Sequence, residues 1–125
     1  NQIELHPFND QRRLIAKCSQ LGIPVAAFSP LAQGRVIDDP VLGEIGRNHG
    51  VSAAQISLAW ILAQPDGIAV PKTGSPRRLG ANLDATRIEL SSDEMARIDR
   101  LSLQHLRLIE PEELAPSWDE PGGAS

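Results

Sequence analysis

The chain has 125 residues, of which 41% are hydrophobic and 22% are charged, and its formal net charge is −4. This composition suits one packed globular domain and excludes a membrane helix, since no apolar run approaches roughly 20 residues, while the negative charge gives no attraction to nucleic acid. The single cysteine, Cys18, excludes an internal disulfide and fits a reducing compartment, so we expect a cytoplasmic protein.

The first elements of the chain alternate as strand, helix and strand. Residues 2–5 are predicted to form a strand that His6-Pro7 stops, and Asn9 or Asp10 is predicted to cap the following helix. Gly22 is placed to end that helix in the left-handed conformation. The apolar positions of the helix recur at helical spacing: Leu14, Ile15, Cys18 and Leu21. Residues 24–28 form a nearly continuous apolar run, which is typical of a strand covered on both faces.

The middle of the chain is predicted to hold a loop and two helices. Residues 29–39 form the loop, in which Ala32-Gln33-Gly34 lacks helical periodicity. Pro40 opens a short helix that Gly50 closes. Ser52-Ala53-Ala54-Gln55 is a capping box that starts a strongly apolar helix.

A third strand and two helices follow. Residues 68–70 are predicted to be the strand, and Ser75 with Pro76 begins a helix that runs to about Ala85. A second capping box, Ser91-Ser92-Asp93-Glu94, opens the last helix.

Three strands, each followed by helical sequence, predict an α/β fold with a parallel sheet. Such a sheet alone leaves two unpaired edges, whereas a closed (β/α)8 barrel removes them. We therefore expect residues 1–110 to be a C-terminal portion of a TIM barrel and residues 111–125, with their prolines and glycines, to be an irregular tail. The chain lacks an initial Met and opens on residues that read as the middle of a strand, which indicates a fragment.

The segment Pro71-Lys72-Thr73-Gly74-Ser75-Pro76-Arg77-Arg78 follows the last predicted strand, where barrel enzymes place their working residues. It combines hydroxyls, cations and a helix N-terminus, a set that favours an anion such as phosphate. Arg78 can form a bidentate pair with phosphate, and Asn82 lies one helical turn further on the same face. A solvated basic helix start is an equally good interpretation of these residues alone.

Other chemically interesting residues have a structural interpretation beside the functional one. Glu4 and His6 share a strand face and are more simply a buried hydrogen-bonded pair than an acid–base pair. Phe28 either stacks on a planar cofactor at the barrel rim or packs beneath a loop. Trp60 is interpreted as core, whereas Trp118, after Pro116 in the tail, is a candidate to close a substrate pocket. The histidines and acids lack metal-ligand spacing, so no metal site is predicted.

Several blocks, in this order, together resemble the aldo-keto reductase family along almost the whole chain. They are Asn1-Gln2-Ile3-Glu4-Leu5-His6-Pro7, Phe28-Ser29-Pro30-Leu31-Ala32-Gln33-Gly34, Ala54-Gln55-Ile56-Ser57-Leu58-Ala59-Trp60 and Val70-Pro71-Lys72-Thr73, with Arg78 and Asn82 in register. The tail, through Leu114-Ala115-Pro116-Ser117-Trp118-Asp119, is similar to that of a bacterial branch, the 2,5-diketo-D-gluconate reductases.

The resemblance implies strands six to eight of the barrel and an NADP(H) site. Gln2 would hold the nicotinamide carboxamide and Phe28 would stack on the nicotinamide ring. Three residues would line the pyrophosphate: Ser29, Leu31 and Gln33. The adenosine 2′-phosphate would be gripped by Lys72, Thr73 and Arg78, and the adenine by Asn82. Relatives often carry Glu where this chain has Ala81, which removes one adenine-side contact.

Catalysis in the family uses a Tyr, a Lys, an Asp and a His from earlier strands. This chain has no tyrosine, and neither Lys17 nor Lys72 matches the catalytic lysine, so no catalytic residue is assigned here. The resemblance implies an intact, monomeric enzyme that transfers hydride from NADPH to an aldehyde or ketone such as a keto-sugar acid or an α-keto aldehyde. A non-catalytic NADP-binding partner protein, like the potassium-channel β subunits, and a phosphate-binding barrel of another family are the alternatives.

Overall fold

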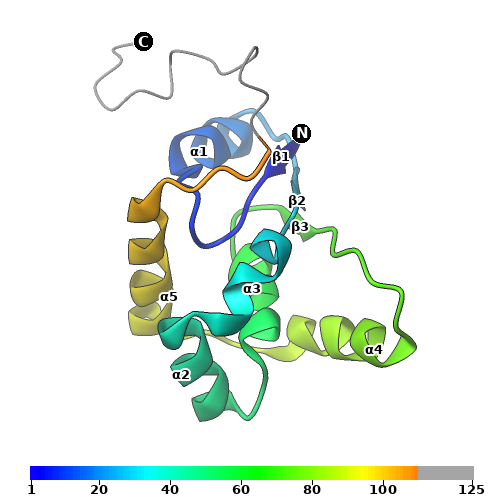
Figure 1. Ribbon diagram of the computed structural model, residues 1–125. Helices are drawn as coiled ribbons and strands as arrows, with labels where there is room; N and C mark the ends of the chain where they lie inside the picture. Colours follow the sequence, from blue (N-terminus) through cyan, green and yellow to red (C-terminus); the bar gives the residue numbers. More distant parts are fainter. Residues whose placement is uncertain (110–125) are drawn as a thin grey trace.

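The computed structural model describes residues 1–109, which include a three-stranded parallel sheet of order β1-β2-β3 (Figure 1). The strands are β1 (Gln2–Glu4), β2 (Val25–Phe28) and β3 (Gly67–Ala69). The α-helices are α1 (Arg12–Gln20), α2 (Pro40–His49), α3 (Ala53–Leu62), α4 (Pro76–Asp84) and α5 (Ser92–Asp99). Three 3₁₀ segments complete the described part: η1 (Ala32–Asp38), η2 (Ala85–Arg87) and η3 (Arg100–Gln104). The predicted α/β fold and parallel strands are confirmed.

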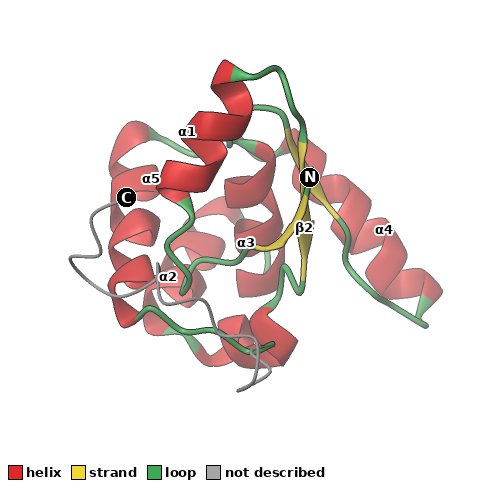
Figure 2. Cartoon of the chain, turned by 90° about the horizontal axis from the view of Figure 1, so that it is seen from above, coloured by secondary structure: helices red, strands yellow, loops and turns green. Residues whose placement is uncertain are grey.

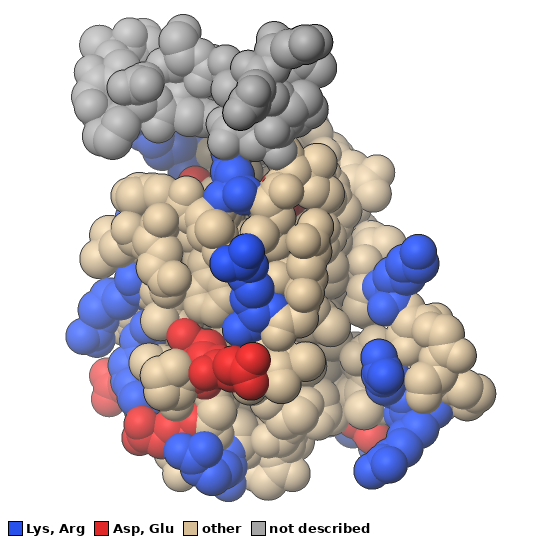
Figure 3. Space-filling view, viewed as in Figure 1, with Lys and Arg blue, Asp and Glu red and all other residues tan. Residues whose placement is uncertain are grey.

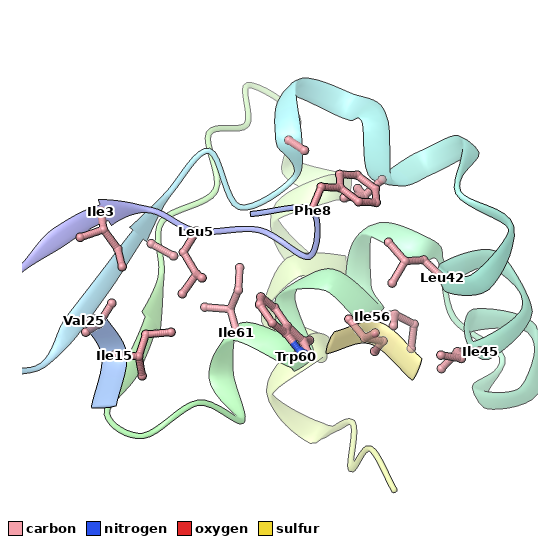
Figure 4. Close-up of a cluster of buried hydrophobic side chains, with 14 of the residues drawn as sticks. Ile3, Leu5, Phe8, Ile15, Val25, Leu42, Ile45, Ile56, Trp60 and Ile61 are labelled. Carbon is pink, nitrogen blue, oxygen red and sulfur yellow. The ribbon is translucent and has the colours of Figure 1, made fainter. Parts of the chain in front are cut away.

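One face of the sheet packs against the helices. Ile3 of β1 and Val25 of β2 are buried there, and Figure 4 shows Ile15 of α1 and Ile61 of α3 beside them. The buried Cys18 belongs to the same core, as predicted. Alternate strand residues point to this face, and α1 and α3 pack their apolar side chains against it.

The opposite face of the sheet remains largely exposed. Ala26 and Phe28 of β2 are only half-buried, and Ile68 of β3 is 50% exposed. The expectation that β2 is covered on both faces is therefore wrong for this chain. The reason is that the helices of this chain cover a single face, whereas a closed barrel would bury the other face against further strands.

Helix α3 is the centre of the core. Six consecutive residues, Ile56–Ile61, are buried, and the indole Nε1–H of Trp60 donates to Asp99 Oδ1 at 2.8 Å. Trp60 therefore serves as core, as predicted, and its polar edge is satisfied by the end of α5.

The predicted helix ends are largely confirmed. Both capping boxes form, with Ser52 and Gln55 at α3 and with Ser91 and Glu94 at α5. Gly50 closes α2 at a φ of 69°. These signals act within one helical turn, so they hold regardless of the rest of the fold.

The start of α1 differs from the prediction. Gln11, not Asn9 or Asp10, is the N-cap residue, and its side chain makes no capping hydrogen bond. Asn9 Nδ2 donates instead to the Glu4 carbonyl at 3.1 Å, and the Asp10 carboxylate binds Arg12. A hydrogen bond to the end of β1, five residues earlier in the chain, thus competes successfully for the Asn9 side chain. Leu21 is 59% exposed, although it was predicted to share the apolar face of α1. It is the C-cap residue, so it no longer follows the helical spacing that buries Ile15 and Cys18.

The loop after β2 also contains more structure than predicted. η1 spans two 3₁₀ turns across a kink at Gln33 and Gly34, where φ is 53° and 90°. The left-handed residues break the periodicity, which is why the sequence did not indicate a helix. No helix in residues 1–109 is long and apolar enough to cross a membrane.

The contribution of a helix cap to stability can be tested at Asp39, the N-cap residue of α2. Its Oδ1 accepts the Leu42 N–H at 2.9 Å, so Asp39→Ala should lower the free energy of unfolding of the complete protein by about 1 kcal/mol. Urea denaturation measures this loss. Asp38→Ala removes the same charge from an exposed neighbour that is not the α2 N-cap and should leave stability nearly unchanged. Equal effects of the two substitutions would show that charge, not capping, matters.

Candidate functional site

The carboxyl ends of the three strands meet at one edge of the sheet, because the strands are parallel and in register. Glu4 of β1 pairs with Phe28 of β2, and Lys72 follows closely after β3. Parallel α/β sheets bind ligands at this edge, where the loops that follow the strands can be specialised without disturbing the core.

The loop that leaves β2 has an unusual backbone. Ser29, Ala32 and Gln33 adopt positive φ values of 51°, 48° and 53°, which residues with a Cβ seldom do. The hydroxyl of Ser57 on α3 donates to the Pro30 carbonyl at 2.7 Å and holds the loop down. Left-handed residues grouped in this way mark functional loops, where packing overrides local strain. Three of the predicted site residues lie in this loop: Ser29, Leu31 and Gln33.

Gln2 and Phe28 lie on the exposed face of the sheet. Gln2 and Glu4 are two residues apart on β1, and Phe28 stands opposite Glu4, so all three point to the same side. Gln2 pairs with Ala26, so Gln2 lies two residues before the level of Phe28 along the parallel strands. Phe28 is half-buried and Gln2 is exposed. A planar group can thus approach the ring from this face.

A second group of predicted residues surrounds the start of α4. Ser75 Oγ accepts the Arg78 N–H at 3.5 Å, and Thr73 Oγ1 accepts the Ser75 N–H at 3.2 Å. Lys72 and Arg78 are exposed, and neither forms an ion pair with any carboxylate of residues 1–109. Figure 3 shows Lys and Arg side chains gathered on the side where α4 lies. The cations, the hydroxyl and the helix N-terminus together suit a phosphate dianion.

The structure keeps these two groups of residues apart. Figures 1 and 2 show α4 standing off the sheet at the end of the extended segment that follows β3. Asn82, half-buried, lies one turn after Arg78 on this helix. Gln55 Nε2 donates to the Ala81 carbonyl at 2.9 Å and ties α4 to α3. An elongated ligand with a planar ring at one end and a phosphate at the other would be needed to contact both groups.

Glu4 and His6 form a buried hydrogen-bonded pair, as predicted. His6 Nε2 lies 2.8 Å from Glu4 Oε1, and His6 is completely buried. Burial lowers the pKa of His6 although Glu4 opposes this effect. Burial alone would raise the pKa of Glu4, but hydrogen bonds from Leu108, His6 and Ile109 outweigh it and hold that pKa below its ordinary value.

The backbone partners of Glu4 were not foreseen from the sequence. The N–H groups of Leu108 and Ile109 donate to its two carboxylate oxygens at 2.8 and 3.0 Å. No spacing rule connects residues 104 positions apart, so only the tertiary structure shows this contact. Trp118, the predicted pocket residue, lies outside the described residues.

Comparison with known proteins gives a consistent result. A model of the aldo/keto reductase family matches residues 1–103. The methylglyoxal reductase DkgB of Escherichia coli O157:H7 is 34% identical over 95% of this chain and 44% of its own length. The uncharacterized oxidoreductase YtbE of Bacillus subtilis (strain 168) is 42% identical over 86% of this chain and 38% of its own length. The chain thus spans about two fifths of these relatives.

Solved structures agree with the sequence comparison. A putative 2,5-diketo-D-gluconic acid reductase B superimposes with a TM-score of 0.89 at 38% identity, covering 96% of this chain and 43% of the other. A Gox0644 variant in complex with NADPH gives a TM-score of 0.83 at 34% identity, covering 93% and 42% of the two chains. With its parallel sheet, its strained loop after β2 and this match over most of its length, the chain belongs to the aldo/keto reductase family.

Proposed function

We propose that this chain supplies strands six to eight and much of the cofactor site of an NADPH-dependent aldo/keto reductase. The observation that carries the proposal is the group of exposed cations, Lys72 and Arg78, around the capped start of α4 in a member of this family. A cationic site at a helix N-terminus is what selects a cofactor with an extra phosphate. One relative with the same fold is described in complex with NADPH.

The two groups of residues then divide the cofactor between them. Gln2 holds the carboxamide and Phe28 stacks on the nicotinamide ring at the exposed sheet face. The strained loop lines the pyrophosphate through Ser29, Leu31 and Gln33. At α4, the 2′-phosphate is held by Lys72, Thr73 and Arg78, and the adenine by Asn82.

NADPH supplies a hydride when bound. The residues of this chain bind and orient the cofactor, but they do not provide the proton that the carbonyl oxygen must receive. The chain has no tyrosine, so the proton donor and its Lys, Asp and His partners come from other strands of the complete protein.

The substrate is proposed to be a small α-keto aldehyde or keto-sugar acid, since relatives are named methylglyoxal reductase, glyoxal reductase and 2,5-diketo-D-gluconic acid reductase B. The complete protein should act as a monomer. Loss of NADPH absorbance with methylglyoxal and with a keto-sugar acid tests this function. NADPH binding without reduction of either would favour a non-catalytic partner protein, and absence of NADPH binding would refute the proposal.

Replacing the ring of Phe28 should weaken cofactor binding. Phe28→Ala in the complete protein removes a half-buried aromatic face, so the binding free energy of NADPH should fall by roughly 1–3 kcal/mol. Fluorescence titration measures this change. Phe28→Tyr keeps the ring and should bind NADPH as the unchanged protein does. Unaltered affinity in Phe28→Ala would mean that the ring only packs beneath its loop.

A further inference from the structure

The carboxylate of Glu4 joins the first strand to the last described segment of the chain. Oε1 accepts the N–H of Leu108 and faces His6 Nε2, both at 2.8 Å, and Oε2 accepts the N–H of Ile109 at 3.0 Å. Glu4 is 7% exposed, so its charge has little access to water. A buried carboxylate is costly unless donors surround it, and here three donors do so.

His6 donates a hydrogen bond to Glu4 as a neutral imidazole. The Phe8 N–H donates to His6 Nδ1 at 3.3 Å, which requires Nδ1 to be the unprotonated nitrogen and Nε2 to carry the hydrogen. Nε2–H therefore points at Glu4 Oε1. A neutral His6 orients the carboxylate and leaves its negative charge available to the two backbone N–H groups.

Further hydrogen bonds fix both sides of this contact. The Glu4 carbonyl accepts Asn9 Nδ2 at 3.1 Å and Gln11 Nε2 at 3.2 Å, which holds the strand end rigidly against the next turn. The Leu106 N–H donates to the Phe8 carbonyl at 2.8 Å. Three backbone N–H groups of residues 106–109 are thus bound to β1 and the turn after it.

We propose that Glu4 is a positioning residue, which fixes residues 106–109 against β1 and thereby fixes the sheet face that carries Gln2 and Phe28. Glu4 lies two residues from Gln2 on the same strand and directly opposite Phe28. The roles of Gln2 and Phe28 rest on the proposed function, whereas the anchoring of residues 106–109 by Glu4 does not.

Trypsin cleavage tests whether Glu4 anchors residues 106–109, because the bond between Arg107 and Leu108 lies inside this segment. In the complete protein, Glu4→Gln preserves the side-chain volume but replaces one acceptor oxygen with an NH₂ group. One backbone N–H then loses its partner, so cleavage after Arg107 should accelerate roughly tenfold, since proteolysis follows the population of the opened segment. Mass spectrometry of the fragments measures the rate at each site.

Two controls separate anchoring from general loosening. Glu44→Gln makes the same substitution at an exposed carboxylate whose hydrogen bonds, among the described residues, go to Arg97, and it should leave cleavage after Arg107 unchanged. Cleavage between Arg77 and Arg78, at the exposed start of α4, should be the same in Glu4→Gln as in the unchanged protein. Unchanged cleavage after Arg107, or equal acceleration at both sites, would overturn the proposal.

The effect of Glu4→Gln on ligand binding can be measured separately from proteolysis. Glu4→Gln should raise the Kd for NADPH several-fold, because Gln2 and Phe28 would hold its nicotinamide end, while the Kd for adenosine 2′,5′-bisphosphate, which lacks the nicotinamide, stays within about twofold, because the phosphate-binding residues on α4 are untouched. An equal loss of both would show a merely structural role and would also overturn the proposal. If cleavage accelerates as expected but the unchanged protein binds no NADPH, the proposed function fails and the anchor alone stands.

Discussion

Arg78→Ala in the complete protein should collapse the preference for NADPH over NADH. The two cofactors differ by one phosphate on the adenosine ribose, so the preference must arise from groups that meet that dianion. Arg78 is exposed beside the capped N-terminus of α4 and offers a bidentate fork to a phosphate. Losing hydrogen bonds to a charged group costs NADPH roughly tenfold or more in affinity. NADH carries no phosphate there, so its affinity should barely change.

Titration of both cofactors against the purified variant measures the ratio. Arg87→Ala is the matched control, since Arg87 is an exposed arginine of η2 that lies near Asp84 at 3.8 Å and outside the proposed phosphate site. It should preserve the preference. The effect of Arg78→Ala should also shrink at high salt, because exposed charges are screened. Equal weakening of both cofactors would make Arg78 structural and would refute the assigned 2′-phosphate site.

The 125-residue chain by itself should show no measurable reduction of carbonyl compounds by NADPH. It contains no tyrosine to protonate the carbonyl oxygen. Its sheet also exposes a face on which Ile68 is 50% exposed, and Leu83 on α4 is 62% exposed. Apolar surface of this kind requires cover by further strands and helices, and both edges of the sheet remain unpaired among the described residues.

The comparison that tests this expectation joins the chain to the N-terminal portion of a family member, so that the barrel is completed. The joined protein should reduce methylglyoxal with NADPH, whereas the 125-residue chain at the same concentration should not. A cooperative thermal transition together with NADPH-dependent reduction by the chain alone would contradict the proposal that the catalytic groups lie elsewhere.

Local signals in the sequence predicted most of the element boundaries correctly. The capping boxes at Ser52 and Ser91, Pro76 at the start of α4 and Gly50 at the end of α2 all form as expected. Each depends on atoms within about one helical turn, so the rest of the molecule has little influence on it. The predicted cap of α1 was wrong because the Asn9 side chain binds the Glu4 carbonyl at the end of β1 and Gln11 takes the N-cap position, an outcome that the capping pattern does not indicate.

In the candidate site too, some features followed from the sequence and others only from the folded structure. The sequence by itself determined the residue types, their order and the family, because the blocks that carry the resemblance are continuous stretches of chain. The positive φ angles of Ser29, Ala32 and Gln33 were not foreseen, since these residues ordinarily avoid that conformation. Only packing, including the hydrogen bond from Ser57 to Pro30, holds the loop in that shape.

The period of two along a strand determined that Gln2 and Glu4 share a face, but not whether that face would be covered. The tertiary structure decided that this face stays open at Gln2 but is covered at Glu4, where Leu108 and Ile109 bind the carboxylate, and that α4 stands away from it. These features depend on where segments distant in sequence come to lie once the apolar side chains are buried. A carboxylate can accept hydrogen bonds from any donor within reach, and only the folded chain selects which donors those are.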